Sequence, residues 1–225
     1  MDPSERASLS ALHVQTPRTA RVVLCGNRKA AREVWFVLHG YAETADEFIQ
    51  HLAPFATEER LFVAPEGLSR FYRRGMRGEV GASWMTSRDR THEIDDYVAY
   101  LNRVRDRITE GSPSADSLNV LGFSQGAATA ARWMSRSNES VDQLVLWGGG
   151  IPDDVEVEAL QASLNRTIIV TGSKDPYIAE NDVSELLDRM ERGELMYDHI
   201  RYDGKHNLNG EALQGLFSEL DSERA

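Results

Sequence analysis

The sequence contains very little cysteine and no long hydrophobic run. Cys25 is the single cysteine among its 225 residues, which excludes an internal disulfide framework and suits a reducing compartment. No window approaches the roughly eighteen consecutive apolar residues that a membrane-spanning helix requires. The opening residues MDPSERASLS lack the cationic start and the apolar stretch of a secretory signal. We therefore expect a cytoplasmic protein with no stable insertion into a membrane.

Positive charge is also in short supply. The chain has 25 Lys and Arg residues against 36 Asp and Glu residues, a formal net charge of −11. Binding to nucleic acid or to an anionic membrane surface needs clustered cations, so neither is an expected partner. Only three of the basic residues are lysines. Two explanations of this bias stay open, namely a GC-rich genome and adaptation to high salt.

Metal-binding patterns are absent from the sequence. Its His, Cys and Asp residues show none of the spacings that bind zinc, and there is no Asp-rich calcium loop. We therefore expect neither a metal nor another cofactor.

Short apolar runs alternate with longer amphipathic segments along the chain. Five runs of four or five residues lie at 34–38, 61–64, 118–121, 144–147 and 167–170. Their continuous apolar character predicts strands that are buried on both faces of a mostly parallel sheet. Segments 11–15 and 21–24 flank a Thr-Pro-Arg turn and predict an N-terminal antiparallel hairpin at one edge. Segment 196–202 predicts the last strand.

Helices are predicted between these strands. In segment 92–110, apolar residues recur at three- and four-residue spacing, and the other candidates are 45–56, 125–136, 179–192 and 209–220. This alternation predicts an α/β fold with helices on both faces of the sheet. We expect a single domain over 1–225, with 1–9 as a frayed tail. The stretch between the strands 144–147 and 167–170 is too short for a large cap domain.

Segment 66–90 has no periodicity over roughly twenty-five residues, a length that is usually functional in a compact domain. It carries six arginines against three acidic residues, together with several large apolar side chains. Two interpretations are open. The segment contacts a substrate, or it is a surface loop whose arginines pair with the acidic remainder of the chain.

The strongest functional signal is Gly-Phe-Ser-Gln-Gly at 122–126. A predicted strand precedes it and a predicted helix follows, which is the context of a nucleophile elbow. A sharp turn strains the backbone at Ser124 and brings chain segments close together, so glycine is needed two residues to either side. The turn exposes the hydroxyl beside a helix N-terminus, which favours developing negative charge. Ser124 is therefore the candidate nucleophile.

A serine nucleophile needs a base and an acid that orients the base. Of the six histidines, His206 lies in a polar loop between the last strand and the last helix, where sites assemble in α/β sheets. Asp175 follows the strand 167–170 and precedes a proline, which keeps it out of helical geometry. Asp153 and Asp154 are the alternative acids. The order Ser124, Asp175, His206 is the one found in α/β-hydrolases.

Acyl transfer also needs N–H donors for an oxyanion. The backbone N–H of Gln125, at the start of the elbow helix, is one candidate. The other is the N–H of Tyr41, because Gly40 allows the chain to turn directly after the strand 34–38. We expect His39 to support this turn through hydrogen bonds.

These residues resemble the phospholipase/carboxylesterase group of the α/β-hydrolase superfamily, which includes acyl-protein thioesterases. The resemblance runs from about residue 34 to 220, and its motifs are Leu-His-Gly at 38–40, Ala-Pro at 64–65, Ser-Trp at 83–84, Gly-Phe-Ser-Gln-Gly at 122–126, Gly-Ser-Lys-Asp at 172–175 and the loop with His206. It implies an α/β-hydrolase fold in which Ser124, Asp175 and His206 form the triad. It also implies that Tyr41 and Gln125 form the oxyanion hole.

The chain departs from the group at positions near the substrate. Tyr41 stands where the group has leucine or phenylalanine, Ala127 replaces a second glycine, and the expected acidic residue after Trp84 is missing. The acyl-binding loop of the group falls within 66–90, which is rich in arginine here. The departures leave the chemistry intact and argue against a long-chain lipid substrate. We expect a short acyl pocket and an anionic substrate portion attracted by arginines. The pocket residues are Phe71, Trp84 and Met85, and the arginines are Arg73 and Arg74.

The sequence therefore predicts a serine hydrolase that cleaves small-molecule esters with short to medium acyl chains. Thioesters and lysophospholipids are further candidate substrates. Two alternatives stay open: a non-catalytic ligand- or partner-binding protein of the same fold, and an acyltransferase that uses the same triad. We expect a monomer or a weak homodimer.

Overall fold

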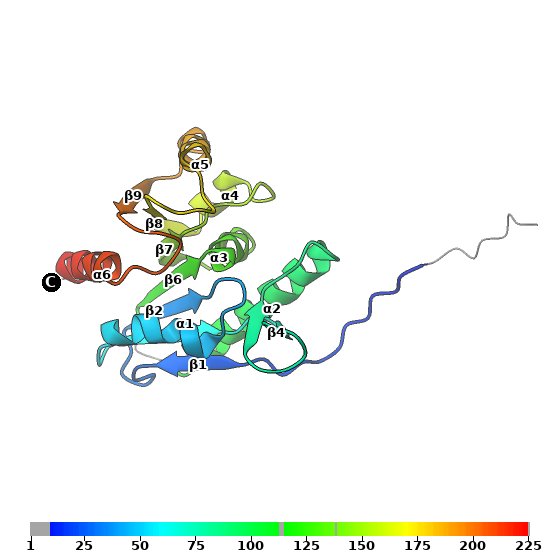
Figure 1. The fold of residues 1–225 in the computed structure, drawn as a ribbon. Helices are drawn as coiled ribbons and strands as arrows, with labels where there is room; N and C mark the ends of the chain where they lie inside the picture. Colours follow the sequence, from blue (N-terminus) through cyan, green and yellow to red (C-terminus); the bar gives the residue numbers. More distant parts are fainter. Residues whose placement is uncertain (1–9, 113–114, 138, 225) are drawn as a thin grey trace, which may run out of the picture.

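The computed structural model describes residues 10–112, 115–137 and 139–224. A seven-stranded sheet with the order β1-β3-β2-β6-β7-β8-β9 forms its centre (Figure 1). Strand β1 is antiparallel to β3 and the other pairs are parallel, which confirms the mostly parallel sheet that the sequence predicts. The strands are β1 (Val22–Cys25), β2 (Glu33–Leu38), β3 (Arg60–Pro65), β6 (Ser117–Phe123), β7 (Val141–Trp147), β8 (Leu164–Gly172) and β9 (Tyr197–Tyr202). The predicted tail 1–9 lies outside the described residues.

Six α-helices flank the sheet in the part of the chain that the structure describes. They are α1 (Ala45–Leu52), α2 (Arg90–Glu110), α3 (Gln125–Ser135), α4 (Val157–Gln161), α5 (Glu180–Arg192) and α6 (Gly210–Arg224). Five of them confirm predicted helices to within a few residues, and a short 3₁₀ turn (Ala53–Phe55) extends α1. The short helix α4 was not predicted. It is the one helix between β7 and β8, so no large cap covers the sheet there.

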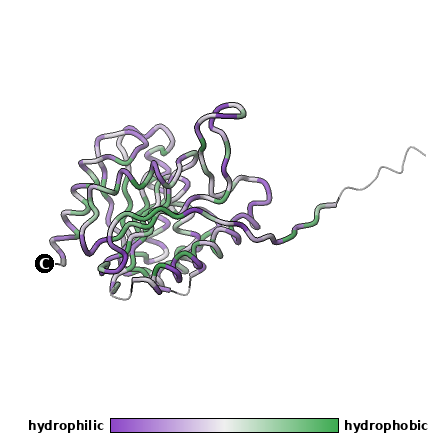
Figure 2. The backbone as a smooth tube through the Cα atoms, turned by 90° about the horizontal axis from the view of Figure 1, so that it is seen from below, coloured by the Kyte–Doolittle hydropathy of each residue, from purple (hydrophilic) through white to green (hydrophobic). Residues whose placement is uncertain are grey.

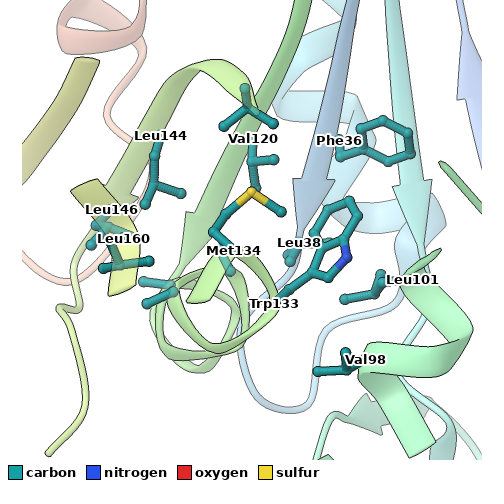
Figure 3. Close-up of a cluster of buried hydrophobic side chains, with 14 of the residues drawn as sticks. Phe36, Leu38, Val98, Leu101, Val120, Trp133, Met134, Leu144, Leu146 and Leu160 are labelled. Atoms are coloured by element: carbon teal, nitrogen blue, oxygen red, sulfur yellow. The ribbon is translucent and has the colours of Figure 1, made fainter. Parts of the chain in front are cut away.

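The helices cover both faces of the sheet, and each face has its own apolar core. Along β2, Val34, Phe36 and Leu38 belong to the core under α2, α3, α4 and α5, whereas Trp35 and Val37 belong to the core under α1 and α6. Figure 1 shows α3 and α6 on opposite sides of the sheet. The first core is drawn in Figure 3, where Trp133 and Met134 of α3 reach towards the strands. Figure 2 shows the hydrophobic segments gathered in the middle of the molecule.

The predicted N-terminal hairpin is wrong in one of its two strands. Segment 21–24 does lead into β1, but β1 pairs with β3. Residues 10–20 form an extended segment without regular structure (Figure 1), and it contacts α2 through His13, whose ring centroid lies 4.2 Å from that of His92. Leu12 and Val14 are 88% and 71% exposed. The alternating apolar residues of 11–15 therefore bury nothing, while β3 offers β1 a partner that is itself fully buried.

Segment 66–90 is more ordered than the lack of periodicity suggests. It contains an antiparallel hairpin of β4 (Ser69–Tyr72) and β5 (Val80–Ser83) that forms a separate two-stranded sheet. The hairpin escapes a periodicity search because each strand has only four residues. It leads into α2, which begins at Arg90.

Candidate active site

Ser124 lies on a strained turn between β6 and α3. Its φ of 54° and ψ of −116° are values that non-glycine residues rarely adopt, and such conformations persist where the surroundings enforce them. The Ser124 N–H donates to the carbonyl of Trp147 at 2.9 Å, and the Ala127 N–H donates to the carbonyl of Ser124 at 3.0 Å. This is the geometry of a nucleophile elbow.

The two glycines of the elbow are required by close backbone contacts. A Cβ on Gly122 would overlap the backbone of Gly126 and Ala127, and a Cβ on Gly126 would overlap the carbonyl oxygens of Leu38 and His39. The steric reason that the sequence suggests for these glycines is therefore present. The contact of Gly126 also places the start of α3 directly against the turn that follows β2.

His206 lies between Ser124 and Asp175. Its Nδ1 is 2.7 Å from Asp175 Oδ2 and its Nε2 is 2.8 Å from Ser124 Oγ. An ionised carboxylate only accepts hydrogen bonds, so in the neutral imidazole the proton is on Nδ1 and Nε2 accepts from the serine hydroxyl. The Asp175 side chain is almost fully buried. The three residues thus form one hydrogen-bonded chain that ends at the hydroxyl of Ser124.

Two side chains beside the His206 loop hold it in place. The Tyr202 hydroxyl lies 2.6 Å from the carbonyl oxygen of Lys205 and 2.7 Å from that of Asn207, so it can donate to either. The indole N–H of Trp147 also donates to the Asn207 carbonyl, at 3.1 Å. The carbonyl groups of the two residues that flank His206 are therefore fixed, which limits how far its ring can move.

The loops that carry Asp175 and His206 are packed against each other. The Lys174 N–H donates to the carbonyl of Gly204 at 2.8 Å. A Cβ on Gly172 would lie 2.6 Å from that same carbonyl oxygen, so only glycine permits this approach. Asp175 and His206 thus lie on neighbouring loops at the carboxyl ends of β8 and β9.

Sequence reasoning missed two residues beside the imidazole. Gly148 has a φ of +57°, and a Cβ there would lie 3.3 Å from the ring of His206. The signal that could have found it is the run of three glycines directly after β7. Tyr177 donates its N–H to Asp175 Oδ1 at 2.8 Å, and its ring lies edge-on to His206 with 4.9 Å between centroids. The Tyr177 side chain is 78% exposed.

His39 directs the turn that precedes the first candidate oxyanion donor. Its Nε2 accepts from the Gly67 N–H at 2.9 Å, so its proton is on Nδ1 and donates to the Gly40 carbonyl at 2.7 Å. Burial lowers the pKa of His39, which favours this neutral form. The Gly40 carbonyl and the Tyr41 N–H belong to one planar peptide and point in opposite directions. His39 therefore sets the direction of the Tyr41 N–H.

The backbone N–H groups of Tyr41 and Gln125 are both available. Among the residues that the structure describes, neither group donates to a protein acceptor. Their segments touch, because Gly126 lies against the carbonyl of His39. Two free donors beside a serine nucleophile can stabilise the oxyanion of a tetrahedral intermediate.

The side chain of Gln125 has a second role that the sequence did not reveal. Its Oε1 accepts from the Trp84 N–H at 3.0 Å, and its Nε2 donates to the carbonyl of Met85 at 2.9 Å. The residue that follows Ser124 therefore fixes the segment between β5 and α2.

The three residues predicted to line an acyl pocket lie in different environments. Trp84 is 1% exposed and donates its indole N–H to the His39 carbonyl at 2.9 Å. It therefore supports the turn after β2 from within the core. Phe71 is half-buried and stacks on Tyr41 with 5.3 Å between centroids. Met85 is also half-buried, with its sulfur 3.7 Å from Arg132 Nη1. Phe71 and Met85 are thus partly exposed, whereas Trp84 is not.

The two arginines predicted to attract an anion differ as well. Arg73 donates its Nε–H to the Ala42 carbonyl at 2.7 Å and pairs with Glu47. Arg74 is exposed and has no ion-pair partner among the residues that the structure describes. The charge of Arg73 is thus largely engaged, whereas that of Arg74 is free.

The alternative acids are far less suited to orient His206. Asp154 accepts two hydrogen bonds from Arg132, at 2.8 and 2.9 Å, and one from Arg90 at 2.7 Å. The hydrogen bonds from Arg132 are the main cause of its lowered pKa. Asp153 is fully exposed and lies 3.5 Å from Arg189. Neither carboxylate contacts the imidazole.

Two further searches concern metals and membranes. Within the described ranges, no three His, Cys, Asp or Glu side chains come together as a possible metal site. Over the same residues, no helix combines the length and the apolar character needed to cross a bilayer.

Comparison with known proteins identifies a family match. The family model described as Serine hydrolase (FSH1) matches residues 35–208. These bounds include the turn after β2, the elbow and both loops that carry Asp175 and His206. A search of the curated proteins finds no match to this chain.

Several solved structures share the fold. The esterase PE8 has a TM-score of 0.69 and 19% identity, and the alignment covers 91% of this chain and 99% of that chain. The acyl-protein thioesterase 2 of Zea mays also has a TM-score of 0.69, with 18% identity and coverage of 91% and 99%. A carboxylesterase of Bacillus cereus has a TM-score of 0.69, 16% identity and coverage of 90% and 94%. The structural similarity establishes the α/β-hydrolase fold. Sequence identities this low do not indicate which substrate the chain acts on.

Proposed function

Because this chain belongs to the serine hydrolase (FSH1) family, we propose that it cleaves carboxylic esters through an acyl-enzyme formed on Ser124. The observation that carries the proposal is the hydrogen-bonded chain from Asp175 through His206 to the serine hydroxyl, with 2.7 and 2.8 Å links. An unassisted serine hydroxyl is a weak nucleophile, and an adjacent oriented base is what activates it.

The acylation step uses all five candidate residues. Ser124 Oγ attacks the ester carbonyl carbon while its proton passes to His206 Nε2. Asp175 stabilises the imidazolium that forms. The N–H groups of Tyr41 and Gln125 bind the oxyanion of the tetrahedral intermediate. When the intermediate collapses, the bond to the leaving alcohol breaks and His206 returns the proton to that alcohol.

Deacylation repeats these steps with water. His206 removes a proton from a water molecule, which attacks the acyl carbonyl, and the proton then passes to Ser124 Oγ as the acid is released. An alcohol in place of water would give the acyltransferase reaction. We propose hydrolysis as the reaction, with acyl transfer to an alcohol as the alternative that product analysis tests.

The proposed substrate class rests on exposed and half-buried side chains of segment 66–90. Phe71 and Met85 provide apolar surface for a short to medium acyl chain, and Arg74 offers an unpaired positive charge to an anionic portion of the substrate. The similar structures include a carboxylesterase and an acyl-protein thioesterase. We therefore propose oxyesters as the main class, with thioesters and lysophospholipids to be tested beside them.

The decisive experiment is hydrolysis of p-nitrophenyl esters of increasing acyl length, with Ser124→Ala as the control. We expect turnover by the parent that is lost in the variant, and an optimum at a short or medium chain. Labelling by a fluorophosphonate probe should follow the same pattern. Folded parent protein that shows neither turnover nor labelling would refute the proposal and favour the non-catalytic binding protein. Product analysis with an added alcohol distinguishes an acyltransferase.

A further inference from the structure

The turn that carries the Tyr41 N–H contains a strained residue. Ala42 has a φ of +67°, a left-handed conformation that is costly for a residue with a Cβ. Within the turn, the Glu43 carboxylate accepts from the Gly40 N–H at 2.8 Å, and the Glu43 N–H reaches the Gly40 carbonyl only at 3.4 Å. A turn with one strained residue and one long internal hydrogen bond needs support from other segments.

Strand β5 supplies part of this support. The Ala42 N–H donates to the Ala82 carbonyl at 2.9 Å, and the Ala82 N–H donates to the Glu43 carbonyl at 3.1 Å. A Cβ on Gly81 would lie 2.5 Å from the Ala42 carbonyl oxygen, so glycine is required for the strand to come this close. The β4–β5 hairpin is therefore docked on the oxyanion turn itself.

Arg73, just after β4, completes the contact. Its Nε–H donates to the Ala42 carbonyl at 2.7 Å, its Nη2 pairs with Glu47 of α1, and its Nη1 lies 3.9 Å from Glu79. Only 25% of its side chain is exposed. One guanidinium thus links the peptide after the strained Ala42 to helix α1 and to Glu79, which directly precedes β5. A planar group with several donors can hold such a geometry, and a single point charge cannot.

Two further contacts of the hairpin strengthen its attachment to the turn after β2. Phe71 of β4 stacks on Tyr41, with an angle of 26° between the rings. The Arg73 N–H also donates to the Glu79 carbonyl at 2.9 Å, which closes the hairpin at the level of the guanidinium. Tyr41 is therefore held through its ring by β4, and the two peptides that follow it are held by β5 and Arg73.

We propose that Arg73 is a positioning residue, which holds the Ala42 peptide so that the Tyr41 N–H points at the developing oxyanion. This role rests on the proposed esterase function. It separates Arg73 from Arg74, whose exposed charge acts on the substrate directly. Loss of Arg73 then weakens stabilisation of the transition state for every ester, whatever the charge of the ester.

The test compares kcat and KM for a neutral and an anionic ester in Arg73→Met, Arg73→Lys and the parent. Removing one oxyanion donor costs about 100- to 1,000-fold in kcat, and misplacing a donor costs less. We expect kcat of Arg73→Met to fall about 30-fold on both esters, with KM nearly unchanged. Arg73→Lys should recover only part of this, because an ammonium cannot bind Ala42 and Glu47 with the same fork. The labelling rate by a fluorophosphonate should fall in parallel with kcat.

Arg77→Met is the matched control, because Arg77 is an exposed residue of the same hairpin. Its kcat should equal that of the parent. Glu47→Gln provides a second variant in case Arg73→Met does not fold. It retains an oxygen for the Thr44 N–H but removes the charge opposite Arg73, and kcat should fall severalfold on both esters.

The outcomes separate this inference from the proposed function. A parent without turnover and without labelling would overturn both. An active parent whose kcat survives Arg73→Met within threefold would overturn the positioning role alone. So would a rise in KM confined to the anionic ester, which is the behaviour of a residue that attracts substrate.

Discussion

Replacing Asp175 with asparagine tests the proposed triad most directly. Asp175 accepts two hydrogen bonds, from the Tyr177 N–H at 2.8 Å and from His206 Nδ1 at 2.7 Å. Asparagine has one carbonyl oxygen and one amide NH₂. The Tyr177 N–H can only donate, so the asparagine oxygen should face it and the NH₂ should face His206. The NH₂ group then requires Nδ1 to be an acceptor, which moves the imidazole proton to Nε2.

The magnitude follows from this change of tautomer. An Nε2 that carries a proton cannot accept one from Ser124, so the base is lost although every ring stays in place. In a serine protease the same kind of substitution lowers kcat about 10⁴-fold, which corresponds to about 5.5 kcal/mol of lost transition-state stabilisation. We expect a decrease of similar size here. The free energy of unfolding should change by less than about 1 kcal/mol, because the side-chain volume and one hydrogen bond are retained.

The assay is steady-state hydrolysis of the best p-nitrophenyl ester, with Ser124→Ala as the baseline and urea unfolding as the measure of stability. Asp154→Asn is the matched control, because Asp154 is one of the two alternative acids and contacts Arg132 instead. It should cost about 2 kcal/mol of stability, less than a fully buried ion pair, and leave kcat per folded molecule near the parent value. The lowered pKa of Asp154 in the parent means that its ionised carboxylate contributes this stability above about pH 4 to 5. The contribution is lost as the pH falls.

Two results would refute the reasoning. A decrease in kcat of less than about tenfold in Asp175→Asn would show that the tautomer of His206 does not depend on this carboxylate. An equal loss of kcat in Asp154→Asn would show that the alternative acid takes part in catalysis. The unfolding data distinguish either result from a general loss of folded protein.

Three further substitutions test the supports of the site. Burial raises the pKa of Glu43 above its ordinary 4.5, so the parent loses stability as the pH rises through that raised value, and Glu43→Gln should remove this decline in unfolding experiments from pH 4 to 8. Tyr202→Phe removes the donor to the carbonyls beside His206 and should cost about 1 kcal/mol of stability, with a severalfold lower kcat; an unchanged kcat would show that the loop needs no such donor. Gly148→Ala places a Cβ 3.3 Å from the imidazole at a positive φ, and we expect about 1–2 kcal/mol of destabilisation and at least a tenfold lower kcat; activity equal to the parent would contradict the close approach.

The central sheet could be predicted because local composition determines most of it. The five apolar runs became β2, β3, β6, β7 and β8, since a strand covered by helices on both faces must be apolar at every position. The N-terminal hairpin failed for a different reason. A turn signal and alternation describe what residues 11–15 could do, but the choice of β3 as the partner of β1 depends on which edge the finished sheet leaves open.

The proposed triad could be identified because each member directly follows a strand, at the one edge of the sheet where parallel strands bring their ends together. The groups that hold the triad could not be found this way. Tyr202 lies within β9 and acts through its hydroxyl on carbonyls several residues later. Gly148 matters because of a ring that is distant in sequence. Such roles depend on three-dimensional contacts, and a single sequence contains no record of them.

The arginines of 66–90 show how charge in a sequence differs from charge in a structure. The sequence allows two interpretations, substrate attraction and pairing with the acidic remainder of the chain. In the structure, some of the arginines have carboxylate partners and others have none among the described residues. Carboxylates within 4.0 Å accompany four of the six arginines, namely Arg70, Arg73, Arg88 and Arg90. Two of these partners, Glu47 and Asp154, come from α1 and from the loop after β7, far outside the segment. Because an ion pair carries no net charge, attraction of an anionic substrate should depend on Arg74, which has no carboxylate partner among the residues that the structure describes. It should therefore weaken with added salt, while the contribution of Arg73 to kcat should not.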